Sequence, residues 1–167
     1  MNWTAATAAF VCSVAAGFFA AAGRTRRSKT LGLLVLLLQR MKLELSFSRV
    51  TVPDMLSAMG TEQPFRLFGF LGVCKAALES GQTLCGAWRL AVDSVQNLLL
   101  PWEKAHLLQL AAVLGTTDLD GQKEAIEGTL QVLQTSLADA QSQQKSSVSL
   151  CRVCGLCTGC VLFIMIL

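Results

Sequence analysis

Uncharged apolar segments lie at both ends of this chain, and a mixed apolar and polar sequence lies between them. Residues 1–23 contain no charged side chain, and residues 153–167 are again uncharged to the last residue. A helix over 148–167 would be about 30 Å long, which matches the hydrocarbon thickness of a bilayer. The pattern therefore predicts a transmembrane anchor at 1–23, a helical bundle domain at 24–147 and a transmembrane helix at 148–167.

The middle of the chain is patterned as helices, because no segment of any length alternates apolar and polar residues at period two. Proline and glycine mark the boundaries: Pro53 and Pro101 each open a helix, and Gly81 follows the end of one. We expect an all-α domain of five or six helices joined by short connections. The predicted ranges are 28–47, 53–59, 64–79, 83–98, 101–114 and 118–147.

The first and last of these helices carry the strongest apolar patterns. We expect Ser28 or Thr30 to cap the first helix, in which residues 31–38 are apolar around most of the circumference and should be deeply buried. Thr117 and Asp118 should cap the last helix, whose apolar positions recur at spacings of 7, 4, 3, 4 and 3 and so share one face. These positions are Leu119, Ile126, Leu130, Leu133, Leu137 and Ala140.

The charge distribution predicts how the chain is oriented at a membrane. A basic cluster of Arg24, Arg26, Arg27 and Lys29 directly follows the first apolar segment, whereas residues 30–147 carry nine basic and eleven acidic side chains. By the positive-inside rule the cluster stays in the cytosol, so both termini lie outside and the bundle lies inside. The cluster is explained equally well by contact with anionic membrane lipids and by membrane topology alone, and the slightly acidic bundle argues against nucleic acid as a partner.

The last apolar segment holds cysteines at every third position, namely Cys151, Cys154, Cys157 and Cys160. Similar spacing occurs in iron–sulfur ligand runs, which leaves a membrane redox or metal-binding protein as an alternative function. On a helix, however, each three-residue step turns by about 60°, so the four sulfurs spread over half the circumference. We favour close helix packing through small residues, with Gly155 and Gly159 at the interface, and acylation of the cysteines stays open.

The sequence offers no catalytic set. His106 is the single histidine and has no Ser or Cys partner at a recognisable spacing, so we interpret it as a structural or surface residue. There is no phosphate-binding Gly-rich loop, no HExxH motif and no pair of metal-binding carboxylates. We therefore expect a non-enzymatic protein without a cofactor. A small pore subunit is a weaker alternative, because the predicted spans contain few polar side chains.

Several local patterns occur in an order that resembles one known family. An acidic-aliphatic-x-aromatic sequence ends the first bundle helix, and an LG-x-x-D-x-x-x-Q turn precedes the last. The matching residues are Glu44, Phe47, Pro53, Trp88, Leu114, Gly115, Asp118 and Gln122. Together with the two apolar ends, these patterns resemble stage III sporulation protein AB of endospore-forming bacteria over nearly the whole chain. The chain departs from the family in Phe47, where Tyr is expected, in Thr51, where Pro is common, and in its Cys-rich last helix.

The resemblance implies a structural role in sporulation. Members of this family belong to the mother-cell side of the channel complex that joins mother cell and forespore. Their soluble domain is similar to the cytosolic six-helix domain of type II secretion F and pilus platform proteins. The chain is therefore expected to be a membrane platform in the mother cell, required for sporulation. Its expected partners are the secretion-type sporulation ATPase, which it would recruit, and other membrane components of the same complex.

Overall fold

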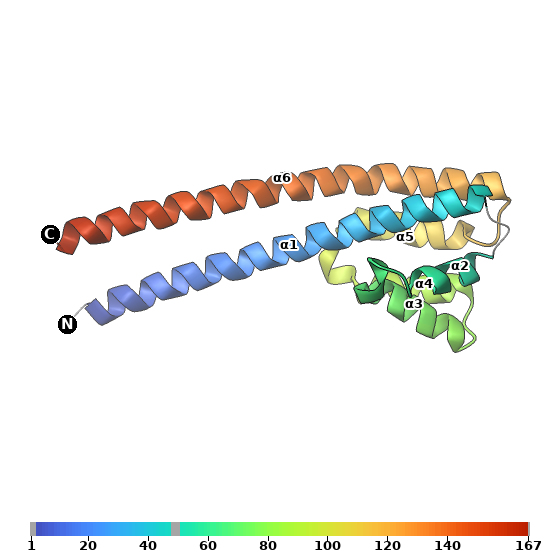
Figure 1. Ribbon diagram of the computed structural model, residues 1–167, viewed down its shortest axis with the longest axis horizontal. Helices are drawn as coiled ribbons and strands as arrows, with labels where there is room; N and C mark the ends of the chain where they lie inside the picture. The colour runs from blue at the N-terminus through green and yellow to red at the C-terminus, as the bar shows by residue number, and fades with distance from the viewer. Residues whose placement is uncertain (1–2, 48–50, 167) are drawn as a thin grey trace. The chain divides into compact units, whose positions relative to one another are not determined.

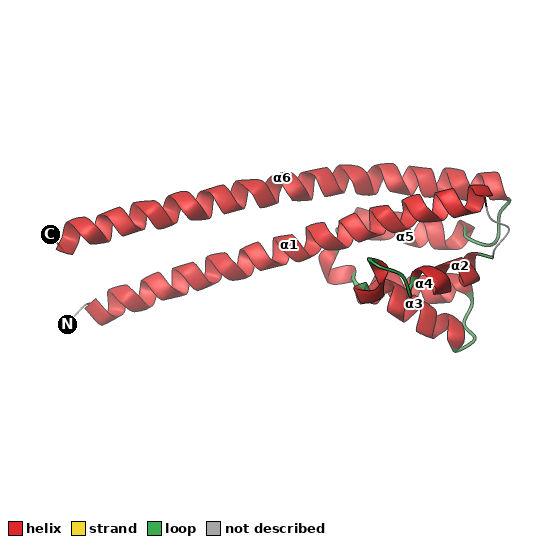
Figure 2. Cartoon of the chain, in the orientation of Figure 1, coloured by secondary structure: helices red, strands yellow, loops and turns green. Residues whose placement is uncertain are grey.

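The computed structural model of the chain is helical throughout the part that it describes. It describes the backbone of residues 3–47 and 51–166, and the side chains of residues 25–47 and 51–143. Within these ranges the chain forms six α-helices, two short 3-10 helices and no strand, which confirms the predicted all-α class (Figure 1, Figure 2). The elements are α1 (Trp3–Phe47), α2 (Val52–Met59), η1 (Phe65–Leu67), α3 (Gly69–Glu79), α4 (Leu84–Ser94), η2 (Gln96–Leu98), α5 (Pro101–Val113) and α6 (Leu119–Ile166).

The chain divides into two compact units. The first, which we call the helical unit, is Lys29–Leu137 and lies inside the predicted 24–147 domain; the second consists of residues 1–28 and 138–167. Among the described residues we find no helix that combines the length and the apolar character needed to cross a bilayer. The side chains of the predicted anchors at 1–23 and 148–167 lie outside the described residues, so both anchors stay predictions.

Antiparallel helix pairs build the helical unit. Within it, α1 and α6 run in opposite directions, and the Lys42 ammonium on α1 lies 2.9 Å from the Glu127 carboxylate on α6 (Figure 1). Helices α3, α4 and α5 follow one another as hairpins with short connections. The indole Nε1–H of Trp88 on α4 donates a 2.9 Å hydrogen bond to the carbonyl oxygen of Leu107 on α5. This bond ties two helices together inside the core.

The core is apolar and centres on α1 and the aromatic side chains of α3 and α4. The ring of Phe70 meets that of Trp88 edge to face, with centroids 5.1 Å apart, and stacks on Phe68 at 5.5 Å. The expected burial of residues 31–38 is confirmed at five positions, whereas Gly32 and Leu33 are half-buried and Leu36 is exposed. The α1 side chains with no exposed surface are Leu31, Leu34, Leu37, Leu38 and Met41. Burial of this many large apolar groups is the main contribution to the stability of the unit.

Two predicted helices are interrupted, and the first interruption buries apolar side chains. The predicted helix 64–79 begins only at Gly69, because Phe68 adopts an extended conformation after the η1 turn and inserts its ring beside Phe70. The predicted helix 83–98 ends at Ser94, where Val95 leaves the helical conformation and a short 3-10 turn follows.

Local signals determined most of the other helix ends. Thr51 caps α2, since its hydroxyl accepts the Asp54 N–H at 3.5 Å, and Pro53 lies in the first turn as predicted. Gly81 follows α3 with a positive φ of 84°, a conformation that favours glycine. The prediction that Ser28 or Thr30 caps a helix is wrong. Both residues lie inside α1, which is continuous from Trp3 to Phe47, because no glycine or proline with a breaking conformation separates the two halves.

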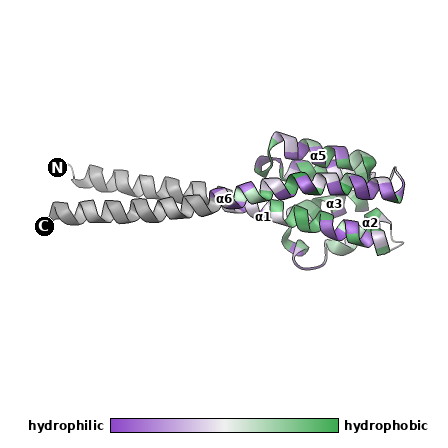
Figure 3. Cartoon of the chain, turned by 90° about the horizontal axis from the view of Figure 1, so that it is seen from above, coloured by the Kyte–Doolittle hydropathy of each residue, from purple (hydrophilic) through white to green (hydrophobic). Residues whose placement is uncertain are grey.

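The apolar stripe predicted for the last helix is present in part on α6. Ile126 and Leu133 are fully buried and Ala140 is nearly so, whereas Leu130 and Leu137 are half-buried. Leu119, at the start of the helix, is exposed. Apolar and polar residues are interspersed along the helices of the helical unit, as expected for amphipathic helices around a core (Figure 3).

Candidate functional site

Seven of the eight residues that carry the family resemblance gather at one end of the helical unit. We call this the distal end and define it by residues 43–47, 51–54 and 114–122, which are the end of α1, the start of α2 and the α5–α6 connection. The end of α1 and the α5–α6 connection lie at the same end of the unit (Figure 1). Trp88 is the exception, because it lies in the core with no exposed surface.

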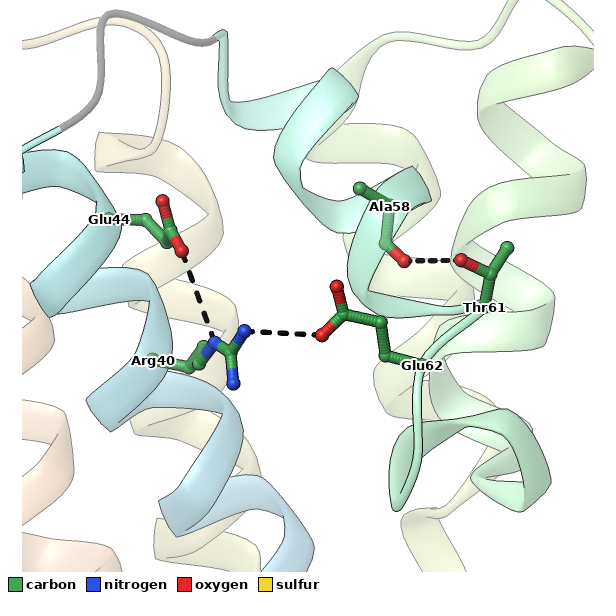
Figure 4. Close-up of polar contacts among 5 residues, drawn as sticks. All are labelled: Arg40, Glu44, Ala58, Thr61 and Glu62. Atoms are coloured by element: carbon green, nitrogen blue, oxygen red, sulfur yellow. Dashed lines mark hydrogen bonds and ion pairs between the residues drawn. The ribbon is translucent and has the colours of Figure 1, made fainter.

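Glu44 takes part in a short chain of ion pairs at the edge of the distal end. The Arg40 guanidinium lies 4.0 Å from the Glu44 carboxylate on the same helix and 3.2 Å from the Glu62 carboxylate, which follows α2 (Figure 4). Thr61, beside Glu62, donates its hydroxyl to the Ala58 carbonyl at 2.7 Å and closes the end of α2. All three charged side chains are about half exposed, so these ion pairs position the segment after α2 more than they stabilise the fold.

The α5–α6 connection depends on Gly115. Its φ is 79°, and a Cβ at this position would lie 3.2 Å from a methyl group of Leu84. Leu114 next to it is buried, so the turn is pressed against the unit from one side. Only glycine meets both requirements without strain, which explains the leucine–glycine pair in the sequence.

Gln122 holds the other side of the same connection. Its side chain is nearly fully buried, and its amide Nε2–H donates a 2.7 Å hydrogen bond to the Thr117 carbonyl. Asp118 occupies the position before α6, where its carbonyl accepts the Gln122 N–H at 3.0 Å. Asp118 and Gln122 are four residues apart, which is the spacing of one backbone hydrogen bond in the first turn of a helix. The Gln122 side chain reaches back from this turn to the connection that leads into α6.

Exposed apolar side chains cluster at the distal end. Phe47 is 84% exposed, and Leu43 and Leu119 are each 56% exposed. Leu43 and Phe47 are four residues apart and lie on one face of α1. Large apolar groups exposed together on a small domain are typical of surfaces that bind another protein.

The other candidate residues of the sequence are distributed as follows. Arg26 and Lys29 of the basic cluster are exposed and Arg27 is half-buried, while the Arg24 side chain lies outside the described residues. The predicted packing interface at Gly155 and Gly159 lies outside the residues whose surroundings the structure describes. The four-cysteine run lies outside them as well. No group of three His, Cys, Asp or Glu side chains that could hold a metal occurs among the residues the structure describes. His106 is half-buried on α5.

Comparison with known proteins identifies the family. The family model of stage III sporulation protein AB matches residues 2–167. The chain belongs to the stage III sporulation protein AB family. A solved structure described as "Stage III sporulation protein AB (SpoIIIAB)" has the same fold, with a TM-score of 0.60 and 22% sequence identity over 72% of this chain and 98% of that one. A comparison with curated proteins found no match.

The family assignment confirms the resemblance read from the sequence and gives the protein a role in sporulation. Sequence reasoning missed two members of the exposed cluster in this stage III sporulation protein AB chain, Leu43 and Leu119. Leu119 was assigned to the buried stripe of the last helix because it shares the period of that stripe. Its position as the first residue of α6, at the tip of the unit, was the available signal that it would be exposed.

Two cysteines of this family member lie in the helical unit and differ in their surroundings. Cys74 on α3 is fully buried, and burial raises the pKa of its thiol from 9.0 to about 11. Cys85 at the start of α4 is half-buried. Both are free thiols.

We expect alkylating reagents to modify Cys85 much faster than Cys74 in the folded chain at pH 8, because only an accessible thiolate reacts. Peptide mapping by mass spectrometry would measure each site, and equal rates in denaturant would be the control. Labelling of Cys74 that is faster than that of Cys85 would contradict the packing of α3.

The raised pKa of Cys74 also predicts an effect of pH on stability. The unfolded chain ionises this thiol above about pH 9, whereas the folded chain keeps it protonated to about pH 11. The stability contributed by Cys74 burial should therefore be lost as pH rises through this window.

Proposed function

We propose that this chain is a non-enzymatic membrane platform of the sporulation channel complex, and that it recruits the secretion-type sporulation ATPase to the mother-cell membrane. Membership of the stage III sporulation protein AB family supports the sporulation role. The predicted anchors at 1–23 and 148–167 would hold the helical unit at the cytosolic face, with both termini outside. The other membrane components of the complex would contact the same anchored chain.

We assign the ATPase contact to the distal end. Within the helical unit α1 runs from Lys29 to the distal end, and α6 runs from the distal end to Leu137, so the unit continues into the rest of the chain at the far ends of these two helices. The distal end is therefore the part of the unit that a cytosolic partner can approach most freely. The single observation that carries the proposal is the exposure of Leu43, Phe47 and Leu119 at this end.

The proposal predicts that polar substitution at the distal end weakens ATPase binding. Full-length chain in lipid nanodiscs would be titrated with the purified ATPase, and the double variant Phe47→Ser with Leu119→Ser should bind at least about tenfold more weakly, which corresponds to about 1.4 kcal/mol. Both side chains are exposed, so the fold should be retained and circular dichroism should be unchanged.

Leu67→Ser is the matched control, since Leu67 is 88% exposed but lies in η1 outside the distal end. This variant should bind as tightly as the natural chain. Equal weakening by the control and the double variant would show that the contact is not at the distal end. Failure of the natural chain to bind in nanodiscs would reject ATPase recruitment itself.

A further inference from the structure

A second exposed apolar surface lies at the junction of η2 and α5. We call it the η2–α5 corner and define it as residues 98–102, with the sequence Leu-Leu-Leu-Pro-Trp. Trp102 is 54% exposed and the three leucines are half-buried, so the corner presents a continuous apolar strip at the surface. Neither the family resemblance nor the distal end accounts for it.

The corner lies at the end of the helical unit from which the chain leaves. Helices α5 and α6 form an antiparallel hairpin through a short turn, so the start of α5 lies away from the start of α6 and towards Leu137. Figure 1 shows the α4–α5 connection at the end of α5 that lies away from the α5–α6 turn. The corner and the distal end are thus at opposite ends of the unit.

The corner carries no exposed carboxylate. Residues 94–102 contain no charged side chain. The flanking acids are engaged: Asp93 lies 2.8 Å from the Lys104 ammonium, and the fully buried Glu103 accepts the Leu100 N–H at 2.7 Å. The exposed Lys29 at this end is basic. An anionic surface would therefore meet apolar and basic groups here and no repulsion from nearby unpaired acids.

The corner is also held in a defined conformation. Pro101 occupies the first turn of α5, and the Leu100 carbonyl accepts the Lys104 N–H at 3.0 Å. The Lys104 ammonium additionally donates to the Gln96 side-chain oxygen at 3.0 Å, which ties η2 to α5. Trp102 is therefore presented by a rigid turn, and little conformational entropy would be lost when it enters an interface.

We propose that the η2–α5 corner inserts into the headgroup region of an anionic bilayer as a third point of membrane contact. The inference rests on the proposed function, because it requires the anchor at 1–23. Leu31, the first fully buried residue of α1 in the helical unit, follows Gly23 by only about 12 Å of helix, which keeps this end of the unit close to the headgroups. Trp and Leu beside basic residues are the side chains that bind such interfaces.

Insertion would fix the rotation of the helical unit about its anchors. The distal end would then point away from the bilayer towards the cytosol. This orientation is the one that ATPase recruitment requires.

Fluorescence quenching by brominated lipids tests the proposal on the full chain. Trp3→Phe leaves Trp88 and Trp102, and Trp88 is fully buried and serves as an internal reference. In vesicles of phosphatidylglycerol and phosphatidylcholine brominated near the headgroup, we expect loss of most Trp102 emission and a blue shift relative to detergent. The matched control carries Trp3→Phe, Trp102→Phe and Phe47→Trp, which moves the fluorophore to the exposed distal end and should abolish the quenching.

Flotation of the vesicles after an alkaline wash separates the two ways in which the idea can fail. If the chain floats but Trp102 is not quenched, the corner does not enter the membrane and this inference alone is rejected. If the chain does not float, the anchors of the proposed function fail and the inference fails with them. Quenching of both fluorophore positions would reject the assigned orientation, and an emission change that needs added ATPase would make the corner a protein contact instead.

Discussion

Replacing Trp88 by alanine is expected to lower the free energy of unfolding by about 3–5 kcal/mol, a large share of the stability of a small domain. The side chain has no exposed surface, meets Phe70 edge to face and donates its indole N–H to the Leu107 carbonyl. Alanine would leave a cavity between α3, α4 and α5 and remove the indole bond to the Leu107 carbonyl. Urea titration of the full chain in detergent, followed by far-ultraviolet circular dichroism, would measure the loss.

Two further variants separate packing from hydrogen bonding at this position. Trp88→Phe keeps much of the apolar volume but removes the donor, so it should cost less than alanine. Trp102→Ala removes an exposed indole and should change the stability by no more than about 0.5 kcal/mol. A small effect of Trp88→Ala, similar to that of Trp102→Ala, would mean that Trp88 does not lie in the core.

Replacing Glu103 by alanine is expected to cost about 2–3 kcal/mol. This side chain is fully buried at the start of α5, and its carboxyl oxygen accepts the Leu100 N–H at 2.7 Å. Its loss would remove a helix-capping interaction and leave a partly buried donor without its acceptor. The same urea titration would measure the change, and the η2–α5 corner should become sensitive to proteases as its turn loosens.

Glu103→Gln is the control for this prediction, since an amide oxygen can still accept the Leu100 N–H. It should retain most of the stability that alanine loses. If the two variants are equally destabilised, the buried carboxyl group acts through contacts other than the Leu100 bond. If neither is destabilised, the described turn is not the one that forms in solution.

The two ends of the helical unit have different chemistry, and this division links the proposals. The distal end combines family-motif residues with exposed Phe47 and Leu119, whereas the η2–α5 corner presents the exposed Trp102. The proposed platform would need one surface for its membrane and another for its partner. In this chain about 27 Å of α1, from Lys29 to Phe47, separates the two.

The sequence alone determined the all-α class, six helical segments in their order and most helix ends in the helical unit. Pro53, Pro101 and Gly81 act within one or two turns of their own position, so their effect can be read without knowledge of the rest of the fold. The order of motifs also identified the family, which the match over residues 2–167 confirms.

Only the tertiary structure decided where helices break inside an apolar run and which apolar positions are exposed. The interruption at Phe68 exists because its ring packs against Phe70, and the exposure of Leu119 follows from its place at the tip of the unit. Periodicity records which residues share a helix face, but neighbouring helices decide whether that face is covered. The gathering of seven motif residues at the distal end, and of Trp102 at the opposite end, likewise results from antiparallel packing between segments that are distant in sequence.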